Sequence, residues 1–442
     1  MHKQFKRLAK QFTTTLFAIG FIASAQHAAA EDLLDVYKLA LQNDAVYLAA
    51  ADEYEARKLN LPLAKSNFRP FISASGDLGR TRSDVTGTDI TSDNNQLRLD
   101  LDLPLFDRVQ SIGIDQAELE VENARIQFEI AHDDLTLRLA ESYFSLLGFQ
   151  DAREVARRQR IAIKRQMDLA AERLDVGLGT RTDLFDARAR FQQADSDVIT
   201  ADIEINNALQ ALIEIINVTP ETVEKLSDDA PLEFPEPNEL SSWVDRSKTN
   251  NLRVVAAGTE LLVASQEIDR QRAVRIPTVS LGASQRYTDN TATSISDGND
   301  SSTAVALSLN LPLYLGGTIN LRTKQAGLQY NAFEQALDLA KRRAVSDTTV
   351  AFRAITSGIS RVNALAEAVI AGENALQAKE EGFSAGLTTN IDVLDAQRDL
   401  TRSSTDYLRA KYNYILSLLD LEQAVGDLGE EDILRINEWL TE

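Results

Sequence analysis

Asp392 and Asp395 are the residues of this chain whose type and spacing most clearly suggest chemistry. Three positions apart, they share one face of a predicted helix. If several copies of the chain surrounded one axis, such pairs would form a ring of carboxylates that favours cations and repels anions. In a plainer interpretation they are acids in the first turn of a helix, after a polar cap at Thr389 or Asn390. The spacing alone favours the plainer interpretation.

Residue types that bind metals or perform catalysis are scarce. The chain has no cysteine, and His132 is the single histidine after residue 30. Because His132 falls inside a long predicted helix, a packed or solvated side chain is expected there rather than a ligand, and zinc-site spacing is missing. A glycine-rich phosphate loop and a hydrolase Gly-x-Ser-x-Gly motif are not expected either. We therefore expect no catalytic residue, no cofactor, no metal site and no enzymatic activity.

The formal net charge of -21 excludes one class of partner. Nucleic-acid binding needs clustered lysine and arginine, so none is expected. The charge fits a self-repelling surface or a lumen that attracts cations.

Residues 1–30 have the order of a secretory signal peptide. Four basic residues precede an apolar stretch at 16–25, and Ala28–Ala30 provide small residues for cleavage. An N-terminal membrane anchor is the alternative, but the apolar stretch is short for a span of about 20 residues. Export from the cytoplasm is therefore expected.

The remaining chain reads as an internal duplication. Leu103–Phe106 is echoed by Leu311–Tyr314, and Gly177–Leu178 by Gly386–Leu387, in the same order and at a nearly constant offset. A proline-rich stretch, which would end helices, separates the two halves. The expected units are a first repeat at 31–219, a linker at 220–237, a second repeat at 238–428 and a C-terminal tail at 429–442.

Each repeat follows one plan of helix, β-hairpin, long helix and further helix. The long helices, predicted from three- and four-residue apolar spacing, would each extend roughly 100 Å. That length is unusual for a globular domain, although a coiled-coil stalk would also explain it. The first helices are predicted at 32–66 and 238–273, the hairpins at about 68–106 and 276–314, and the long helices at 109–175 and 318–384.

The hairpins are the most informative elements. Leucines alternate with polar residues from Leu97 to Leu105, and apolar residues alternate similarly from Val305 to Leu313. About ten residues of this pattern are typical of transmembrane β-strands, although hairpins half-buried on helices would show it too. Polar loops are expected at 83–96 and 288–302. Phe106 and Tyr314 would end equivalent strands, at the level of an interfacial aromatic belt.

Four strands cannot close a barrel in a membrane, because an open edge leaves backbone groups without hydrogen-bond partners in hydrocarbon. Three copies would supply twelve strands with closed symmetry, whereas two would supply only eight, whose interior side chains fill. A homotrimer around a pore is therefore expected.

The sequence resembles the TolC-type family of outer-membrane efflux and type I secretion channels. The most specific matches are Leu311–Tyr314 followed by Gly316-Gly317, and Gly386 followed by Ile391–Ala396. The resemblance implies a mixed α and β fold, in which a trimeric 12-stranded transmembrane β-barrel continues into a long α-helical barrel across the periplasm. It also implies partners: a periplasmic adaptor and an inner-membrane ABC or proton-driven transporter, with outer-membrane lipid around the barrel.

The resemblance also assigns roles to residues. Asp392 and Asp395 match paired aspartates around the periplasmic entrance, and Gly177 and Gly386 would lie in the turns at its tip. Thr182 and Asp183 match a pair that holds the entrance shut. However, Phe383 and Thr388 stand where the family has the tyrosine and arginine that bond to this pair, so Arg181 is an alternative closing residue.

Function is expected to be that of a passive exit duct for drugs, secreted proteins or both. The alternative is a periplasmic coiled-coil protein with a structural, adhesive or adaptor role. The cargo cannot be read from the sequence, although the missing lipidation cysteine leans towards the secretion branch of the family.

Overall fold

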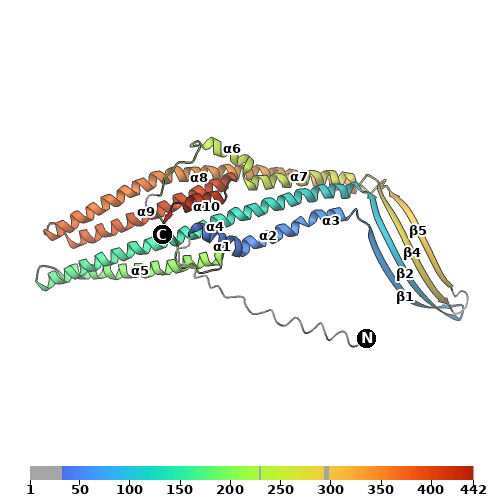
Figure 1. The fold of residues 1–442 in the computed structure, drawn as a ribbon, viewed down its shortest axis with the longest axis horizontal. Helices are drawn as coiled ribbons and strands as arrows, with labels where there is room; N and C mark the ends of the chain where they lie inside the picture. Colours follow the sequence, from blue (N-terminus) through green and yellow to red (C-terminus); the bar gives the residue numbers. More distant parts are fainter. Residues whose placement is uncertain (1–31, 228–229, 293–297, 442) are drawn as a thin grey trace, which may run out of the picture.

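The protein is an elongated rod of helices that ends in a β-sheet (Figure 1). The structure, a computed structural model, describes residues 32–227, 230–292 and 298–441. The predicted signal peptide at 1–30 lies outside these residues. No helix within the described ranges is both long and apolar enough to cross a membrane.

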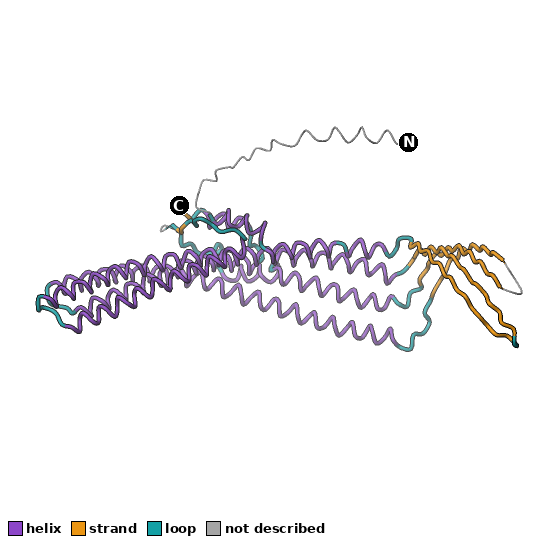
Figure 2. Tube along the Cα trace, turned by 90° about the horizontal axis from the view of Figure 1, so that it is seen from below, coloured by secondary structure: helices purple, strands orange, loops and turns teal. Residues whose placement is uncertain are grey.

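Two helical hairpins form most of the rod. Helix α4, Arg108–Asp175, returns as α5, Arg181–Ile216, and helix α8, Thr318–Ser384, returns as α9, Asn390–Val425. The hairpins lie side by side, and their tips are at the end of the rod opposite the sheet (Figures 1 and 2). The long helices predicted at 109–175 and 318–384 are confirmed.

The predicted helices at 32–66 and 238–273 are not continuous. The first is divided into α1, α2 and α3, and the second into α6 and α7. Polar caps cause two of the breaks: Asp44 accepts a 2.7 Å hydrogen bond from the backbone N–H of Tyr47, and Asn251 accepts one of 3.0 Å from that of Arg253. The bounds are Leu33–Asn43, Ala45–Lys58, Asn60–Ser66, Leu240–Asn250 and Leu252–Ala273.

Four long antiparallel strands form one sheet in the order β1-β2-β4-β5. Strand β2 pairs with both β1 and β4, which joins the two predicted hairpins directly. The outer edges of β1 and β5 have no partner strand among the described residues of this single chain. The bounds are Phe71–Val85, Thr88–Phe106, Thr278–Ala292 and Gly298–Asn310.

The prediction of loops at 83–96 and 288–302 is wrong for most of these residues, which belong to the strands instead. Strands β1 and β2 continue to a two-residue turn, in which Thr86 and Gly87 have φ of 53° and 79°. Such a turn matches the twist of a hairpin, but threonine is not among the residues that usually signal it. In the second hairpin the strands reach Ala292 and resume at Gly298.

Phe106 and Tyr314 do not end equivalent strands. Phe106 is the last residue of β2, whereas β5 ends at Asn310 and Tyr314 lies four residues further on, 83% exposed. Strand β2 accommodates Pro104 with a register shift against β4. After β5, Pro312 offers no N–H for pairing, and the chain turns towards α8.

The main apolar core lies at mid-rod, where α1, α4, α5, α8 and α9 meet (Figure 1). Tyr143, Phe144 and Ile355 are almost fully buried there. The predicted tail is part of this core, since α10, Glu430–Asn437, buries Ile433 and Ile436. Its last strand, β6 at Leu440–Thr441, pairs with β3 at Lys225–Leu226, which lies inside the predicted linker.

Candidate functional site at the helical tips

The tips of the two helical hairpins have the same backbone geometry. Gly177 and Gly386 have φ of 77° and 74°, a conformation that glycine adopts without steric cost. The next N–H reaches back to the end of the preceding helix in both: Leu178 N donates to Arg173 O, and Leu387 N to Gly382 O, each at 2.8 Å. The predicted tip turns are thus the points where α4 and α8 end.

Each returning helix begins with the same reciprocal cap. The Thr389 hydroxyl accepts a hydrogen bond from Asp392 N at 3.2 Å, and Asp392 Oδ2 accepts one from Thr389 N at 2.9 Å. Thr180 and Asp183 repeat this pattern, at 3.1 Å for both bonds. Asp392 and Asp183 therefore close the first turn of α9 and α5, as the plainer interpretation of Asp392 expected.

Asp392 is nevertheless well suited to carry negative charge. Hydrogen bonds from the Thr389 hydroxyl and backbone N–H lower the pKa of its carboxyl, which is solvent-exposed. Lys379 Nζ lies 3.8 Å from Asp392 Oδ1 and contributes in the same direction. The carboxylate consequently stays ionised at neutral and mildly acidic pH.

Asp395 joins the two hairpins. Its Oδ1 lies 3.2 Å from Nη2 of Arg190 on α5 and 3.4 Å from Nη1 of Arg398 on α9. Each of these side chains is roughly half exposed, so the ion pairs are partly screened by water. The predicted pair of aspartates thus has basic neighbours within a single copy of the chain.

A second contact joins the hairpins at the position of the expected tyrosine. Phe383 is 8% exposed, and the guanidinium carbon of Arg173 on α4 lies 4.4 Å from its ring centroid. A cation placed over an aromatic face is attracted electrostatically by the ring. Thr388 does not bridge the hairpins, since its hydroxyl donates to Lys379 O at 2.9 Å within its own hairpin.

The candidate closing residues Arg181 and Thr182 lie exposed at the start of α5. Among the described residues they make none of the ion pairs or side-chain hydrogen bonds that link the hairpins, and Asp183 is engaged with Thr180. Sequence reasoning therefore missed the residues that join the hairpins here, Arg173 and Arg190. In the sequence, the two residues differ in no way from the many other arginines of the long helices, so no pattern pointed to them.

Behind the tips, α4, α5 and α9 pack through a small apolar cluster. Alanines let these helices approach closely, with Leu394 of α9 filling the space between them. Asn390, the first residue of α9, is only 2% exposed, and neither polar atom of its side-chain amide has a hydrogen-bond partner. The buried members of the cluster are Ile163, Ala170, Ala187, Ala194 and Leu394.

The outer surface of the tips is apolar. Val176, Leu178 and Leu387 are 70%, 79% and 82% exposed, in turns otherwise flanked by polar residues. Three large aliphatic side chains in such a position indicate a contact surface rather than a solvated loop end.

Catalytic geometry is not found at this end. Contrary to the expectation that no hydrolase Gly-x-Ser-x-Gly motif occurs, residues Gly382–Gly386 have its spacing. Ser384, however, ends helix α8 and donates its hydroxyl to Glu380 O at 3.0 Å, so the strand-to-helix turn of that motif is missing. No cluster of three potential metal-binding side chains occurs in the described part of the chain.

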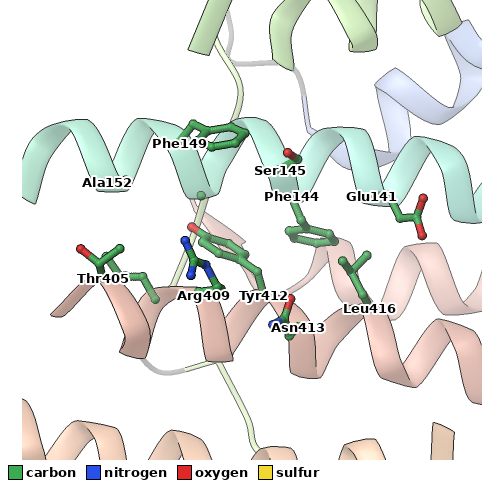
Figure 3. A pocket seen from close by; sticks show the side chains of 12 residues that line it. Glu141, Phe144, Ser145, Phe149, Ala152, Thr405, Arg409, Tyr412, Asn413 and Leu416 are labelled. Atoms are coloured by element: carbon green, nitrogen blue, oxygen red, sulfur yellow. The ribbon is translucent and has the colours of Figure 1, made fainter. Parts of the chain in front are cut away.

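A cleft of about 350 Å³ lies at mid-rod between α4 and α9. Figure 3 shows Phe144 and Tyr412 between the two helices, with Glu141 and Arg409 well apart along the cleft. The ring centroids of Phe144 and Tyr412 are 5.9 Å apart, and the Tyr412 hydroxyl donates to Asp151 at 2.5 Å. Because the charged groups do not converge, the cleft is not arranged for acid–base chemistry.

Comparison with known proteins identifies the family. Residues 36–218 and 243–427 match the family described as "Outer membrane efflux protein". Outer membrane protein TolC of Vibrio cholerae is 31% identical over 441 residues, 98% of this chain and 99% of that protein. Alkaline protease secretion protein AprF of Pseudomonas aeruginosa is 28% identical over 443 residues, 96% of this chain and 90% of that protein.

The fold agrees with a solved structure of similar size. The outer membrane protein VceC of Vibrio cholerae superposes with a TM-score of 0.75 at 18% identity, over 89% of this chain and 96% of that one. A periplasmic stalk or adaptor is not favoured by these matches. With both halves of the chain matched, the protein belongs to the outer membrane efflux protein family.

Proposed function

We propose that three copies of this outer-membrane channel protein form one conduit, with a 12-stranded β-barrel in the membrane and a helical barrel in the periplasm. The observation that carries the proposal is the open sheet. Strands β1 and β5 both end it, and Val305, Leu307 and Leu309 on β5 are about 70% exposed on one face. Further copies would pair both edges and lipid would cover the apolar face.

The dimensions of the sheet support this arrangement. On the apolar face, apolar residues of β2 extend from Leu97 to Phe106. At about 3.3 Å per residue and a tilt of about 40°, this stretch spans roughly 23 Å, close to the apolar band of outer-membrane barrels. Phe106, at its periplasmic end, and Tyr314 beyond it are proposed to contribute to an aromatic belt.

The proposed organisation is a cleaved leader at 1–30, two repeats at 31–219 and 238–428, a linker at 220–237 and a tail at 429–442. Equivalent features support the duplication: caps at Asp44 and Asn251, tip glycines at 177 and 386, and reciprocal caps at 180 and 389.

At the periplasmic end, Asp392 and Asp395 of three copies would form the entrance ring, which favours cations. The apolar surface around Gly177 and Gly386 is proposed as the contact for a periplasmic adaptor, which connects the channel to an inner-membrane ABC or proton-driven transporter. We propose no enzymatic activity and no nucleic-acid partner. Energy for transport would come from the transporter.

Closure of the entrance is proposed to depend on the contacts between the two hairpins. Arg190–Asp395 and Arg173–Phe383 are the contacts that support this, while Thr182, Asp183 and Arg181 would act across neighbouring copies. Because the Arg190 pair ties α5 to α9, Arg190→Ala should loosen the tips and increase leakage of large antibiotics into cells.

Arg398→Ala provides a matched control for this prediction. Arg398 contacts the same carboxylate from within α9 and does not tie the hairpins together. Susceptibility to vancomycin, compared between equally expressed variants, should rise for Arg190→Ala and stay near wild type for Arg398→Ala. Equal susceptibility of the two variants would contradict a closing role for Arg190.

The assembly itself is tested by the outer-membrane fraction. Trimers that resist sodium dodecyl sulphate until heated are expected there, and a soluble monomer would contradict the proposal.

The cargo is tested by deleting the gene. Drug susceptibility and the set of secreted proteins are then each compared between the deletion strain and the wild type. The name of the AprF relative refers to protease secretion, so a loss of secreted protein is the outcome we expect first.

A further inference from the structure

The strand register divides the sheet into two chemically different faces. Leu97, Leu99 and Leu101 share one face with their partners on β1 and β4, which are apolar except for Gln285, and this is the face proposed to contact lipid. In the proposed trimer, on which this inference rests, the other face would line the lumen of the barrel. On that face lie the even-numbered residues of β4 and β5, those of β2 up to Pro104, and the odd-numbered residues of β1.

Small side chains make up much of the lumen face near the arginines, although Phe71 also lies on this face. They come from all strands except β2, and most of them are serine or alanine. They are Ser73, Ser75, Ser280, Gly282, Ser284, Ser302, Ala304, Ala306 and Ser308.

Two arginines interrupt this surface at the same level. Arg98 on β2 is directly opposite Arg286 on β4, and the row is completed by Ser75 and Ser302 on the outer strands. Like charges directly opposite each other are destabilising unless something compensates them. Arg98 is compensated by Asp100, at 2.7 Å, whereas Arg286 makes none of the ion pairs found among the described residues.

The neighbouring rows carry carboxylates. One row towards the hairpin turns, Asp77 and Asp300 lie on the same face, and in the other direction come Asp100 and Asp102. Adjacent rows are separated by about 7 Å along the strands, slightly less than the Debye length of about 8 Å at physiological ionic strength, so the carboxylates of the neighbouring rows still act on the arginines. The arginine row is therefore a basic level between two acidic levels, in which Arg98 is paired with Asp100 and Arg286 makes none of the ion pairs of the described residues.

Three copies would place six arginines at one level. A 12-stranded barrel is roughly 24 Å across between backbones, and the arginines extend inward from this wall while the side chains around them are short. Guanidinium groups bind carboxylates and phosphates through paired hydrogen bonds. We propose that Arg98 and Arg286 form an oxyanion-binding ring within the barrel, which sets how anionic solutes pass this part of the channel.

Purified trimers in planar lipid bilayers test the proposal. In a KCl gradient, the Arg98→Gln/Arg286→Gln double variant should raise the ratio of potassium to chloride permeability by roughly twofold or more, because the positive layer is lost. Citrate added to the bath should reduce the current through wild-type channels and have a weaker effect on the variant. Arg98→Lys/Arg286→Lys should keep the permeability ratio but lose part of the citrate effect, because lysine cannot form the paired bonds.

Arg80→Gln is the matched control. Arg80 lies on β1 on the opposite face, bonded to Asp93 at 2.6 and 2.8 Å, so its loss should leave both measurements at the wild-type values. If conducting trimers of the double glutamine variant keep the wild-type permeability ratio and citrate effect, the ring is refuted. If wild-type protein forms no conducting trimers, the proposed function fails instead, so the two failures are distinguishable.

Discussion

At the scale of single residues, the carboxyl groups of this chain fall into two opposite classes. Asp392 is exposed and has a lowered pKa, because Thr389 donates hydrogen bonds to its ionised form. Asp133 on α4 is 7% exposed and has a raised pKa, because burial disfavours its charge. A raised pKa in the folded state means that the folded protein holds the proton more tightly than the unfolded chain does. Protonated Asp133 therefore favours folding at a pH below the pKa that it has in the unfolded chain, and this contribution is lost as the pH rises through its raised pKa.

Asp133→Asn is therefore expected to stabilise the protein at neutral pH. The gain should shrink as the pH falls through the raised pKa of Asp133 towards its ordinary value, because the wild-type carboxyl is then protonated as well. Thermal unfolding of purified protein between pH 4 and 8 measures this, with Asp52→Asn on the exposed surface of α2 as control. A destabilised variant at pH 7 would show that Asp133 is needed as an anion.

Asn390 is a second residue-scale test. A buried amide without hydrogen-bond partners costs about 1–3 kcal/mol, so Asn390→Leu, which retains a similar volume, should not destabilise the tip and should slow its opening. Hydrogen exchange at the start of α9 is the measurement. Faster exchange in the variant would mean that the wild-type amide finds partners in the assembled channel.

At the scale of elements, the tips depend on backbone caps rather than on a large core. The turn between α8 and α9 has Gly386 at positive φ, the Thr389–Asp392 cap and a small apolar cluster behind it. Local opening is cheapest where few apolar contacts must be broken, so the tips are expected to be the least stable part of the rod.

Thr389→Ala should weaken this turn by about 1 kcal/mol, the usual effect of removing a helix cap. Thr389→Ser keeps the hydroxyl that accepts from Asp392 N and should remain close to wild type. Limited proteolysis at residues 385–390 distinguishes the variants. Equal cleavage of both would indicate that packing of the assembled tips, not the cap, holds the turn.

At the scale of the whole molecule, a single chain leaves two strand edges and a broad apolar face uncovered. Both lie on the same sheet, at the end of the rod opposite the tips (Figure 2). In the assembled trimer, β5 of one copy is therefore expected to pair with β1 of the next.

The complete absence of cysteine makes this pairing directly testable. Variants that combine Ser73→Cys on β1 with a cysteine at position 304, 306 or 308 on β5 should include one that forms covalent trimers on oxidation. A cysteine pair at Leu99 and Gln285, opposite each other within one chain, is the control and should leave monomers on denaturing gels. If no tested register gives covalent trimers, direct pairing of β5 with β1 is contradicted.

Much of the local structure could be predicted from the sequence. Three- and four-residue apolar spacing indicated α4 and α8 almost to the residue, and two-residue alternation indicated β2, because each pattern depends on neighbours within one element. The reach of the hairpin strands past Arg82 could not be predicted, since polar residues mark a loop and an extramembrane strand equally.

Only the tertiary structure decided which distant residues meet. The family resemblance placed Asp392 and Asp395 at the entrance, but packing of α5 against α9 selected Arg190 as the partner of Asp395. Pairing of β2 with β4 likewise placed Arg98 opposite Arg286. The alternation of leucines determines which face of β2 carries Arg98, but no turn connects β2 to β4, so the residue of β4 that lies opposite is decided by how the two hairpins pair.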